Sequence, residues 1–359
     1  MALQQLLQIS FFMLIACTAM AINPEAEALL RWKSTLIGAN SLSSWSLAHP
    51  TCSWYGVACD GAGHVTALSL PGEGIGGKLD AFYSTAFQNL TRLDLSSNNL
   101  AGAIPVNLSM LLTLTSLDLS INSLTGAIPY QLSQLPRIAR LNLGDNHLTN
   151  PEYGKFSPMA SLEFLSLANN DLNGTFPWFV LNCTGRRMRW LDLSANSFSG
   201  HIPSSLPEMI PRLRYLNLSY NGFSGPIPRS LPRLQELKEL CLDNNNLTGG
   251  IPEELGMLSE LYLLMLLNNT LDGPIPASLG NLTSLGIMDL SRNQLHGSIP
   301  PCLAKMQHIL AFRLSGNNLN GVIPPELFTN WTMLQLFDLS KNSFSGSIPA
   351  QIFNFTILR

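Results

Sequence analysis

The segment Leu117–Pro129 reads Leu-Asp-Leu-Ser-Ile-Asn-Ser-Leu-Thr-Gly-Ala-Ile-Pro, and close variants of it recur along the chain. An imperfect unit comes first, with Glu73 in the place of the asparagine. Alignment on the Leu-x-Leu-x-x-Asn core then gives eleven matching asparagines, each 24 to 26 residues after the previous one: Asn98, Asn122, Asn146, Asn170, Asn196, Asn221, Asn245, Asn269, Asn293, Asn317 and Asn342. This spacing indicates one repeat architecture rather than the two ordinary domains that 359 residues could hold.

The composition agrees with a repeat. The chain contains 67 Leu and 30 Asn, while its 27 Gly and 23 Pro exclude long helices. Only 12% of the residues are charged, and the formal net charge is −3. Both values argue against a nucleic-acid-binding protein and against a polybasic membrane-surface protein.

Each unit predicts a short β-strand centred on Leu-x-Leu, and twelve such strands are expected to stack into one parallel sheet. Leucines such as Leu93 and Leu95 would point into the core, and the residues between them would face solvent on the concave side. The asparagine amide can both donate and accept, so it can satisfy backbone groups at the buried corner. Most units continue Leu-x-Gly-x-Ile-Pro, but those after Asn146 and Asn170 do not, which predicts an irregular convex side between about residues 148 and 210.

These features resemble the leucine-rich repeat, and the Gly-x-Ile-Pro segment is typical of its plant type. Residues 28–33, Ala-Leu-Leu-Arg-Trp-Lys, and 52–59, Cys-Ser-Trp-Tyr-Gly-Val-Ala-Cys, resemble the N-terminal capping domain of plant leucine-rich-repeat receptors. The resemblance implies an α/β-type solenoid, a right-handed superhelix with a concave parallel β-sheet. It also implies a capping helix from about Glu25 to Ile37 and a disulfide between Cys52 and Cys59.

The chain is expected to have four parts: a signal peptide (1–21), the cap (22–64), about twelve repeats of which the first is degenerate (65–352), and the start of a truncated further repeat (353–359). The apolar run 6–21 ends in Ala-Met-Ala, which favours cleavage before Ile22; an uncleaved membrane anchor is the alternative. We therefore expect a protein that is secreted or lies at the extracellular face of the plasma membrane. Contact with the membrane would be only through a missing C-terminal part or a partner.

No catalytic chemistry is indicated. Residues 72–77 satisfy G-x-G-x-x-G, but they lie in the repeat register and lack the context of a nucleotide-binding loop. The six histidines have no metal-ligand spacing, and the recurring aspartates belong to the Leu-Asp-Leu-Ser consensus. We expect a protein that is not an enzyme and that has no cofactor or metal.

The remaining cysteines are Cys183, Cys241 and Cys302, because Cys17 would leave with the signal peptide. We expect them to be unpaired and mostly buried, with an intermolecular disulfide still open to one of them. Cys241 is expected in a concave, solvent-facing position between Leu240 and Leu242.

Glycosylation is predicted at several of ten Asn-x-Ser/Thr sites. The acceptor asparagines are Asn89, Asn107, Asn173, Asn182, Asn217, Asn246, Asn268, Asn281, Asn330 and Asn354. Asn217 and Asn268 fall at concave positions, and these are the two that we expect to remain bare.

The concave face is the remaining place for function. The residue six before each repeat asparagine would form one row across the strands, and three consecutive units place aromatic rings there. An exposed aromatic row offers a large contact area with little loss of rotamer entropy; the alternative is that the rings pack against one another or under a glycan. Relatives that bind peptides often hold a ligand carboxylate with two arginines on one unit, but Arg313 has no such companion. The predicted ligand-binding residues are Phe164, Trp190, Tyr215, Tyr220, Glu239 and Arg313.

The resemblance to plant leucine-rich-repeat receptor-like kinases and receptor-like proteins implies a receptor-type solenoid that binds a peptide or protein ligand in signalling or defence. A shorter leucine-rich-repeat co-receptor kinase is a further expected partner, and nucleic acid is not. Two alternatives stay open. One is a secreted inhibitor of microbial cell-wall hydrolases, similar to polygalacturonase inhibitors. The other is an incomplete product of a receptor-kinase gene, since no second cysteine pair, membrane helix or kinase follows the last repeat.

Overall fold

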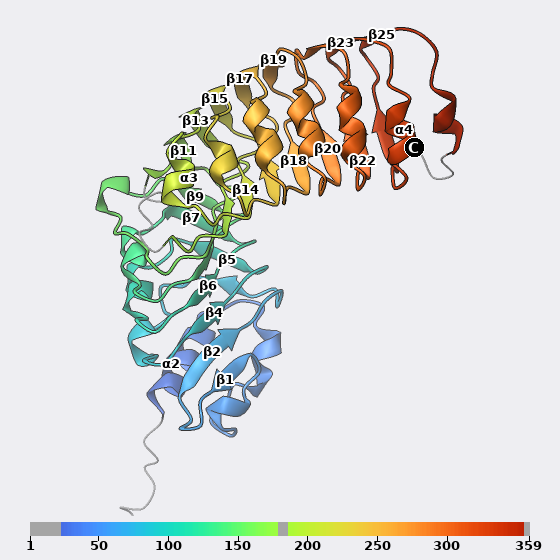
Figure 1. Ribbon diagram of the computed structural model, residues 1–359. Coiled ribbons are helices and arrows are strands. Elements are labelled where there is room, and N and C mark those ends of the chain that lie inside the picture. Colours follow the sequence, from blue (N-terminus) through green and yellow to red (C-terminus); the bar gives the residue numbers. More distant parts are fainter. Residues whose placement is uncertain (1–22, 179–185, 355–359) are drawn as a thin grey trace, which may run out of the picture.

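The computed structural model describes residues 23–178 and 186–354. The expected signal peptide, Asn182 and Cys183 therefore lie outside the described residues. The repeats stack in chain order into an elongated, curved solenoid, with the N-terminal cap at one end and the last repeat at the other (Figure 1). The plant-type leucine-rich-repeat architecture expected from the sequence is confirmed.

One thirteen-stranded sheet runs along the inner side of the curve (Figure 1). Its strands, in spatial order, are β1 (Val57–Cys59), β2 (Val65–Ser69), β4 (Arg92–Asp94), β6 (Ser116–Asp118), β8 (Arg140–Asn142), β10 (Phe164–Ser166), β12 (Trp190–Asp192), β14 (Tyr215–Asn217), β16 (Glu239–Cys241), β18 (Leu263–Met265), β20 (Ile287–Asp289), β22 (Ala311–Arg313) and β24 (Leu336–Asp338). Twelve of these are the predicted strands, paired in parallel. The thirteenth strand, β1, is not among the predicted ones; the cap adds it antiparallel to β2.

The Gly-x-Ile-Pro side of the repeats forms smaller parallel sheets, which the sequence analysis treated only as turns. The first sheet contains β3 (Gly76–Gly77), β5 (Asn99–Gly102), β7 (Ser123–Ala127) and β9 (His147–Thr149). The second contains β11 (Asn173–Thr175), β13 (Ser197–His201), β15 (Gly222–Pro226), β17 (Asn246–Gly250) and β19 (Thr270–Asp272). The third contains β21 (His296–Gly297), β23 (Asn318–Gly321) and β25 (Ser343–Phe344). Equivalent segments of successive units lie side by side, so their backbone groups pair across units.

The first break in this second layer lies between β9 and β11, inside the region that the sequence predicted to be irregular. At the break, the side chain of Asn150 accepts a hydrogen bond from the backbone N–H of Asn173 at 2.9 Å and donates one to the Asn173 side chain at 2.6 Å. The segment that begins Asn150-Pro151 replaces the usual Gly-x-Ile-Pro here. A side-chain amide therefore takes over part of the pairing that main-chain groups make in the other units.

Short helices, mostly single 3₁₀ turns, connect the two layers on the convex side. They are η3 (Ser84–Ala86), η4 (Val106–Met110), η5 (Tyr130–Gln134), η6 (Tyr153–Lys155), α3 (Leu206–Met209), η8 (Leu231–Arg233), η9 (Glu253–Met257), η10 (Ala277–Asn281), η11 (Pro301–Lys305), α4 (Glu326–Asn330) and η12 (Ala350–Asn354). None of the helices among the described residues is long and apolar enough to cross a membrane.

The cap consists of α2 (Pro24–Lys33), η1 (Asn40–Ser44), η2 (Thr51–Ser53) and β1. The helix is shorter than expected: the chain leaves it after Lys33, and Ile37 instead forms a bridge with Gly76 of the first repeat. Trp32 is fully buried and packs edge-on against Phe82 at 5.3 Å, which joins the cap to the repeat core. The disulfide between Cys52 and Cys59 is confirmed.

The repeat asparagines join adjacent units. Asn245, which is buried, donates from its side-chain amide to the carbonyls of Leu218, Leu242 and Asp243 at 3.0–3.1 Å, and its carbonyl oxygen accepts the N–H of Phe223 at 3.0 Å. Its equivalents repeat this pattern along the solenoid, each bonding to the unit before it. The amide thus satisfies backbone groups that the turn leaves without partners, as the sequence predicted.

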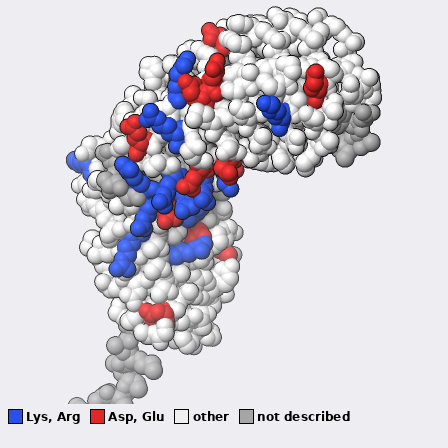
Figure 2. Space-filling view, viewed as in Figure 1, with Lys and Arg blue, Asp and Glu red and all other residues white. Residues whose placement is uncertain are grey.

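The charged side chains are unevenly distributed. Figure 2 shows Lys and Arg gathered over the middle of the solenoid, with some Asp and Glu beside them, whereas the face of the last repeats seen in this view carries few charged side chains. Residues 186–238 contain eight Lys and Arg and three Asp and Glu, a net charge of +5, in a chain with a net charge of −3. The positive charge is therefore local and would not be noticed from the overall composition.

Candidate functional site

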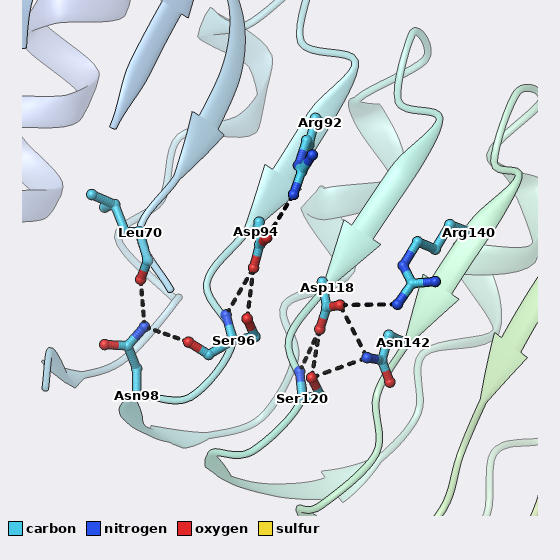
Figure 3. A network of polar contacts seen from close by, with 9 residues as sticks. All are labelled: Leu70, Arg92, Asp94, Ser96, Asn98, Asp118, Ser120, Arg140 and Asn142. Carbon is cyan, nitrogen blue, oxygen red and sulfur yellow. Dashed lines mark hydrogen bonds and ion pairs between the residues drawn. The ribbon is translucent and has the colours of Figure 1, made fainter. Parts of the chain in front are cut away.

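The aspartates of the concave face are used by the turns that follow the strands. Asp94 accepts hydrogen bonds from the N–H and Oγ of Ser96, at 3.2 and 2.7 Å, and Asp118 makes the same contacts with Ser120 (Figure 3). Burial alone would raise the pKa of Asp94, but the bonds from Ser96 and from Arg92, 3.0 Å away, lower it. Among the described residues, no group of His, Cys, Asp and Glu could hold a metal ion.

An aromatic stack occupies the middle of the concave sheet. The rings of Trp190 in β12 and Tyr215 in β14 are parallel within 4° with centroids 3.5 Å apart, and Phe164 in β10 stacks on Trp190 at 5.4 Å. The guanidinium of Arg140 in β8 lies 3.6 Å from the centroid of the Phe164 ring. The rings therefore pack against one another, and because they are half-buried, mainly their edges remain at the surface.

The register of the sheet produces this stack. Arg140 pairs with Phe164, Phe164 with Trp190, and Trp190 with Tyr215, each as the first residue of its strand. Neighbouring strands lie about 4.8 Å apart, so aromatic rings at equivalent positions meet face to face. The three rings are among the predicted ligand-binding residues; Arg140 is not, although it stands in the same row, six residues before Asn146.

The hydroxyl of Tyr215 takes part in a small polar network. It donates to Asp192 at 3.4 Å and accepts from the amide nitrogen of Asn217 at 3.1 Å. Burial and, next, the charge of Asp192 raise the pKa of Tyr215 above its ordinary value. Tyr215 therefore stays neutral at physiological pH, with its ring held by both stacking and hydrogen bonds.

The next strand, β16, adds a carboxylate and a thiol. Glu239 is half-buried, and within the described ranges no Lys, Arg or His lies at ion-pair distance from it. Cys241 is only 9% exposed, so the expectation that it is buried is confirmed and the expectation that it faces solvent is wrong. Burial and the neighbouring Asp243 raise the pKa of Cys241 to about 12, which makes it an unreactive thiol. It is unpaired, as is the half-buried Cys302.

The structure keeps two predicted site residues away from the stack. Tyr220 lies in the turn after β14, 61% exposed, in a left-handed backbone conformation. Arg313 lies in β22, three strands beyond Glu239 in the sheet, and faces Asp289 at 3.4 Å. The candidate site therefore consists of Phe164, Trp190, Tyr215 and Glu239, with Arg140 added.

The predicted glycosylation sites differ in accessibility. Asn173, Asn246, Asn268, Asn281 and Asn330 are exposed, whereas Asn89, Asn107 and Asn217 are half-buried. The amide of Asn217 already donates to Tyr215, so a glycan there would displace a contact of the stack. The side chains of Asn182 and Asn354 lie outside the described residues.

Family models match most of the chain. The leucine rich repeat N-terminal domain matches residues 22–60. Leucine rich repeat models match residues 88–172 and then 187–209, 212–234, 236–258, 284–306 and 333–355. These matches coincide with the cap and with repeats that the structure places in the solenoid.

Individual proteins point in the same direction. A probable leucine-rich repeat receptor-like protein kinase of Arabidopsis thaliana is 40% identical over 106 residues, which are 28% of this chain and 10% of that protein. The crystal structure of the Arabidopsis receptor kinase HAESA, in complex with the peptide hormone IDA and the co-receptor SERK1, is 33% identical, with a TM-score of 0.79; the match covers 94% of this chain and 61% of that one. A plant ice-binding protein is 25% identical, with a TM-score of 0.65, over 90% of this chain and 96% of that one.

Proposed function

The chain belongs to the leucine-rich-repeat proteins, and from this we propose that it is the recognition solenoid of a plant receptor, which binds a peptide or protein ligand on its concave face. Its match covers only 10% of the receptor-like kinase to which it is similar, so kinase activity is no part of this proposal. The likeness to a receptor structure that holds a peptide hormone and a co-receptor supports the same two kinds of partner for this chain, and the receptor-type relatives support an extracellular location.

The aromatic stack is the single observation that carries the placement of the ligand. Its rings cross β10, β12 and β14 and are fixed by one another and by Arg140. Their rotamer freedom is lost on folding, so a ligand that packs on their edges loses little further entropy from them. Large, pre-ordered aromatic groups of this kind are typical of binding hot spots.

Glu239 gives the same surface a polar anchor. It stands directly beside Tyr215 in the sheet register, and without a cationic partner it can accept hydrogen bonds from a ligand. Cys241 has no such role, because its thiol is buried and un-ionised. An extended peptide lying across the strands would thus meet aromatic edges first and a carboxylate next.

The test uses the purified, secreted chain and random dodecapeptides displayed on phage. Peptides selected on the wild-type chain are synthesised, and their affinity is compared between the wild type, a Trp190→Ala/Tyr215→Ala variant and a convex-side control, Met257→Ala. We expect the double variant to bind about 30-fold more weakly and the control to bind normally, since hot-spot truncations are worth about 2 kcal/mol. Equal affinity for all three proteins, with unchanged circular dichroism, would remove the concave stack as the ligand site.

A second candidate function, ice binding, is favoured by one observation, the match over 96% of a plant ice-binding protein. The five-stranded sheet of β11, β13, β15, β17 and β19 also places short uncharged side chains in register. Asn173 lies opposite Ser197, for example, and Thr248 lies opposite Thr270. A measurement of thermal hysteresis on the purified chain tests it. Ice crystals that grow without shaping or delay would dismiss it and leave the receptor proposal untouched.

A further inference from the structure

A row of cations borders the aromatic stack. The residues immediately before β12, β14 and β16 are Arg189, Arg214 and Lys238. Their backbones continue the hydrogen bonding of the inner sheet. The N–H of Arg214 donates to the carbonyl of Arg189, and the N–H of Lys238 donates to the carbonyl of Arg214, both at 2.8 Å. All three side chains are exposed. Arg187 and Arg212 stand two residues earlier in the first two of these units and are exposed as well. We call these five residues the basic rim.

Most of the basic rim has no ion-pair partner among the described residues of the solenoid. Equivalent positions on neighbouring strands lie about 4.8 Å apart, and like charges at such positions destabilise a sheet. Arg214 has a bidentate contact with Glu236 at 2.9 and 3.0 Å. The other four rim residues have no ion pair among the described residues. In a chain of net charge −3, a local excess of positive charge thus lies at this surface, mostly outside ion pairs.

The basic rim and the aromatic stack form one surface. Trp190 directly follows Arg189 in the chain, and Tyr215 directly follows Arg214. Any segment that packs against the ring edges therefore lies within reach of the rim cations. Figure 2 shows Lys and Arg most concentrated over the middle of the solenoid in this view.

We propose that the basic rim binds acidic side chains of the peptide ligand or protein partner that packs on the aromatic stack. This inference rests on the proposed function and specifies the ligand chemistry: a polypeptide with an acidic segment next to an apolar or aromatic one. Acidic groups on such a partner would gain charge-assisted hydrogen bonds from the arginines and relieve their mutual repulsion.

The acids within the surface favour a polypeptide over a uniform polyanion. Glu236 pairs with Arg214, and Glu239 directly follows Lys238 in the chain. Glu163 lies in the neighbouring repeat, where its backbone carbonyl accepts a hydrogen bond from the N–H of Arg189. A polymer with a negative charge on every unit, such as a polyuronate, would meet these carboxylates as well as the cations. A peptide can place its acids only where the cations stand, and its apolar side chains can use the ring edges.

The experiment takes peptides selected on the wild-type chain and compares two charge reversals of equal size. Arg189→Glu/Lys238→Glu alters the rim, and Arg229→Glu/Arg233→Glu alters exposed cations on or beside η8, each of which already faces a glutamate. We expect the selected peptides to be rich in Asp and Glu. In low salt, they should associate with the rim variant about tenfold more slowly than with the wild type, and this difference should shrink in high salt. Their association rate with the control variant should equal that with the wild type.

Several results would overturn the inference. They are a selected pool without acidic excess, no selected pool at all, and acidic peptides that bind both reversal variants equally. Polygalacturonate that binds the wild type but not the rim variant, with no acidic peptide enriched, would make a polysaccharide the occupant instead. Weaker binding to Trp190→Ala/Tyr215→Ala alone would keep the proposed function and remove only the basic rim. Weaker binding to the rim variant alone would remove the aromatic stack as the ligand site and overturn the inference as well, because the inference requires a partner that also packs on the ring edges.

Discussion

Replacement of Asn245 by alanine tests the physical basis of the fold most directly. The three carbonyls that its amide reaches each keep another donor: Asn221 donates to Leu218, Asn269 to Leu242, and the backbone N–H of Tyr220 to Asp243. The N–H of Phe223, by contrast, loses its acceptor inside the solenoid. One orphaned buried donor is worth about 1–3 kcal/mol, and three weakened acceptors add to it. We expect a loss of about 3 kcal/mol in the free energy of unfolding.

The next residue in the chain supplies a matched control. Asn246 is the same residue type one position later, but its side chain is exposed. Asn246→Ala should therefore change stability by less than about 0.5 kcal/mol. Because Asn246 is also a predicted glycosylation site, all proteins are deglycosylated enzymatically before the comparison.

Two measurements examine the effect, one global and one local. Urea unfolding followed by tryptophan fluorescence gives the change in stability. Hydrogen exchange read by mass spectrometry should show faster exchange at the Phe223 amide in Asn245→Ala only. If Asn245→Ala lost less than about 1 kcal/mol and left that amide protected, the view that the asparagines hold adjacent units together would be refuted.

Three further predictions concern single side chains. Ile121 is β-branched in a left-handed conformation (φ 55°), so Ile121→Asn should stabilise the chain by about 1 kcal/mol. Val322 is also an exposed β-branched residue, and Val322→Asn should give no such gain; melting temperatures of the two variants and the wild type decide this. Folding raises the pKa of Tyr215, so the stability that its neutral phenol provides is present below pH 10 and is lost as the pH rises further. In urea titrations above pH 10, the free energy of unfolding of the wild type should therefore fall more steeply with pH than that of Tyr215→Phe. With Ellman's reagent at pH 8, the half-buried Cys302 should react before Cys241, and equal rates would contradict the burial of Cys241.

The candidate site shows where reasoning from sequence stops. Counting back six residues from each asparagine placed Phe164, Trp190 and Tyr215 in one row, and the register of the sheet confirms this. The same count cannot say whether the rings are free or stacked, because that depends on their rotamers. It also offers no reason to single out Arg140, whose role comes from its distance to the Phe164 ring.

The sequence by itself determined the solenoid, its inner sheet and the task of the repeat asparagines. It could do so because each unit repeats the same local rules, and every strand can pair only with its neighbours. The tertiary structure alone decided which positions at the surface act together: the self-packing of the rings, the contact of Arg140 with the Phe164 ring, and the burial of Cys241. Those properties arise between units, from side chains some 24 residues apart that stacking brings within a strand spacing of about 4.8 Å.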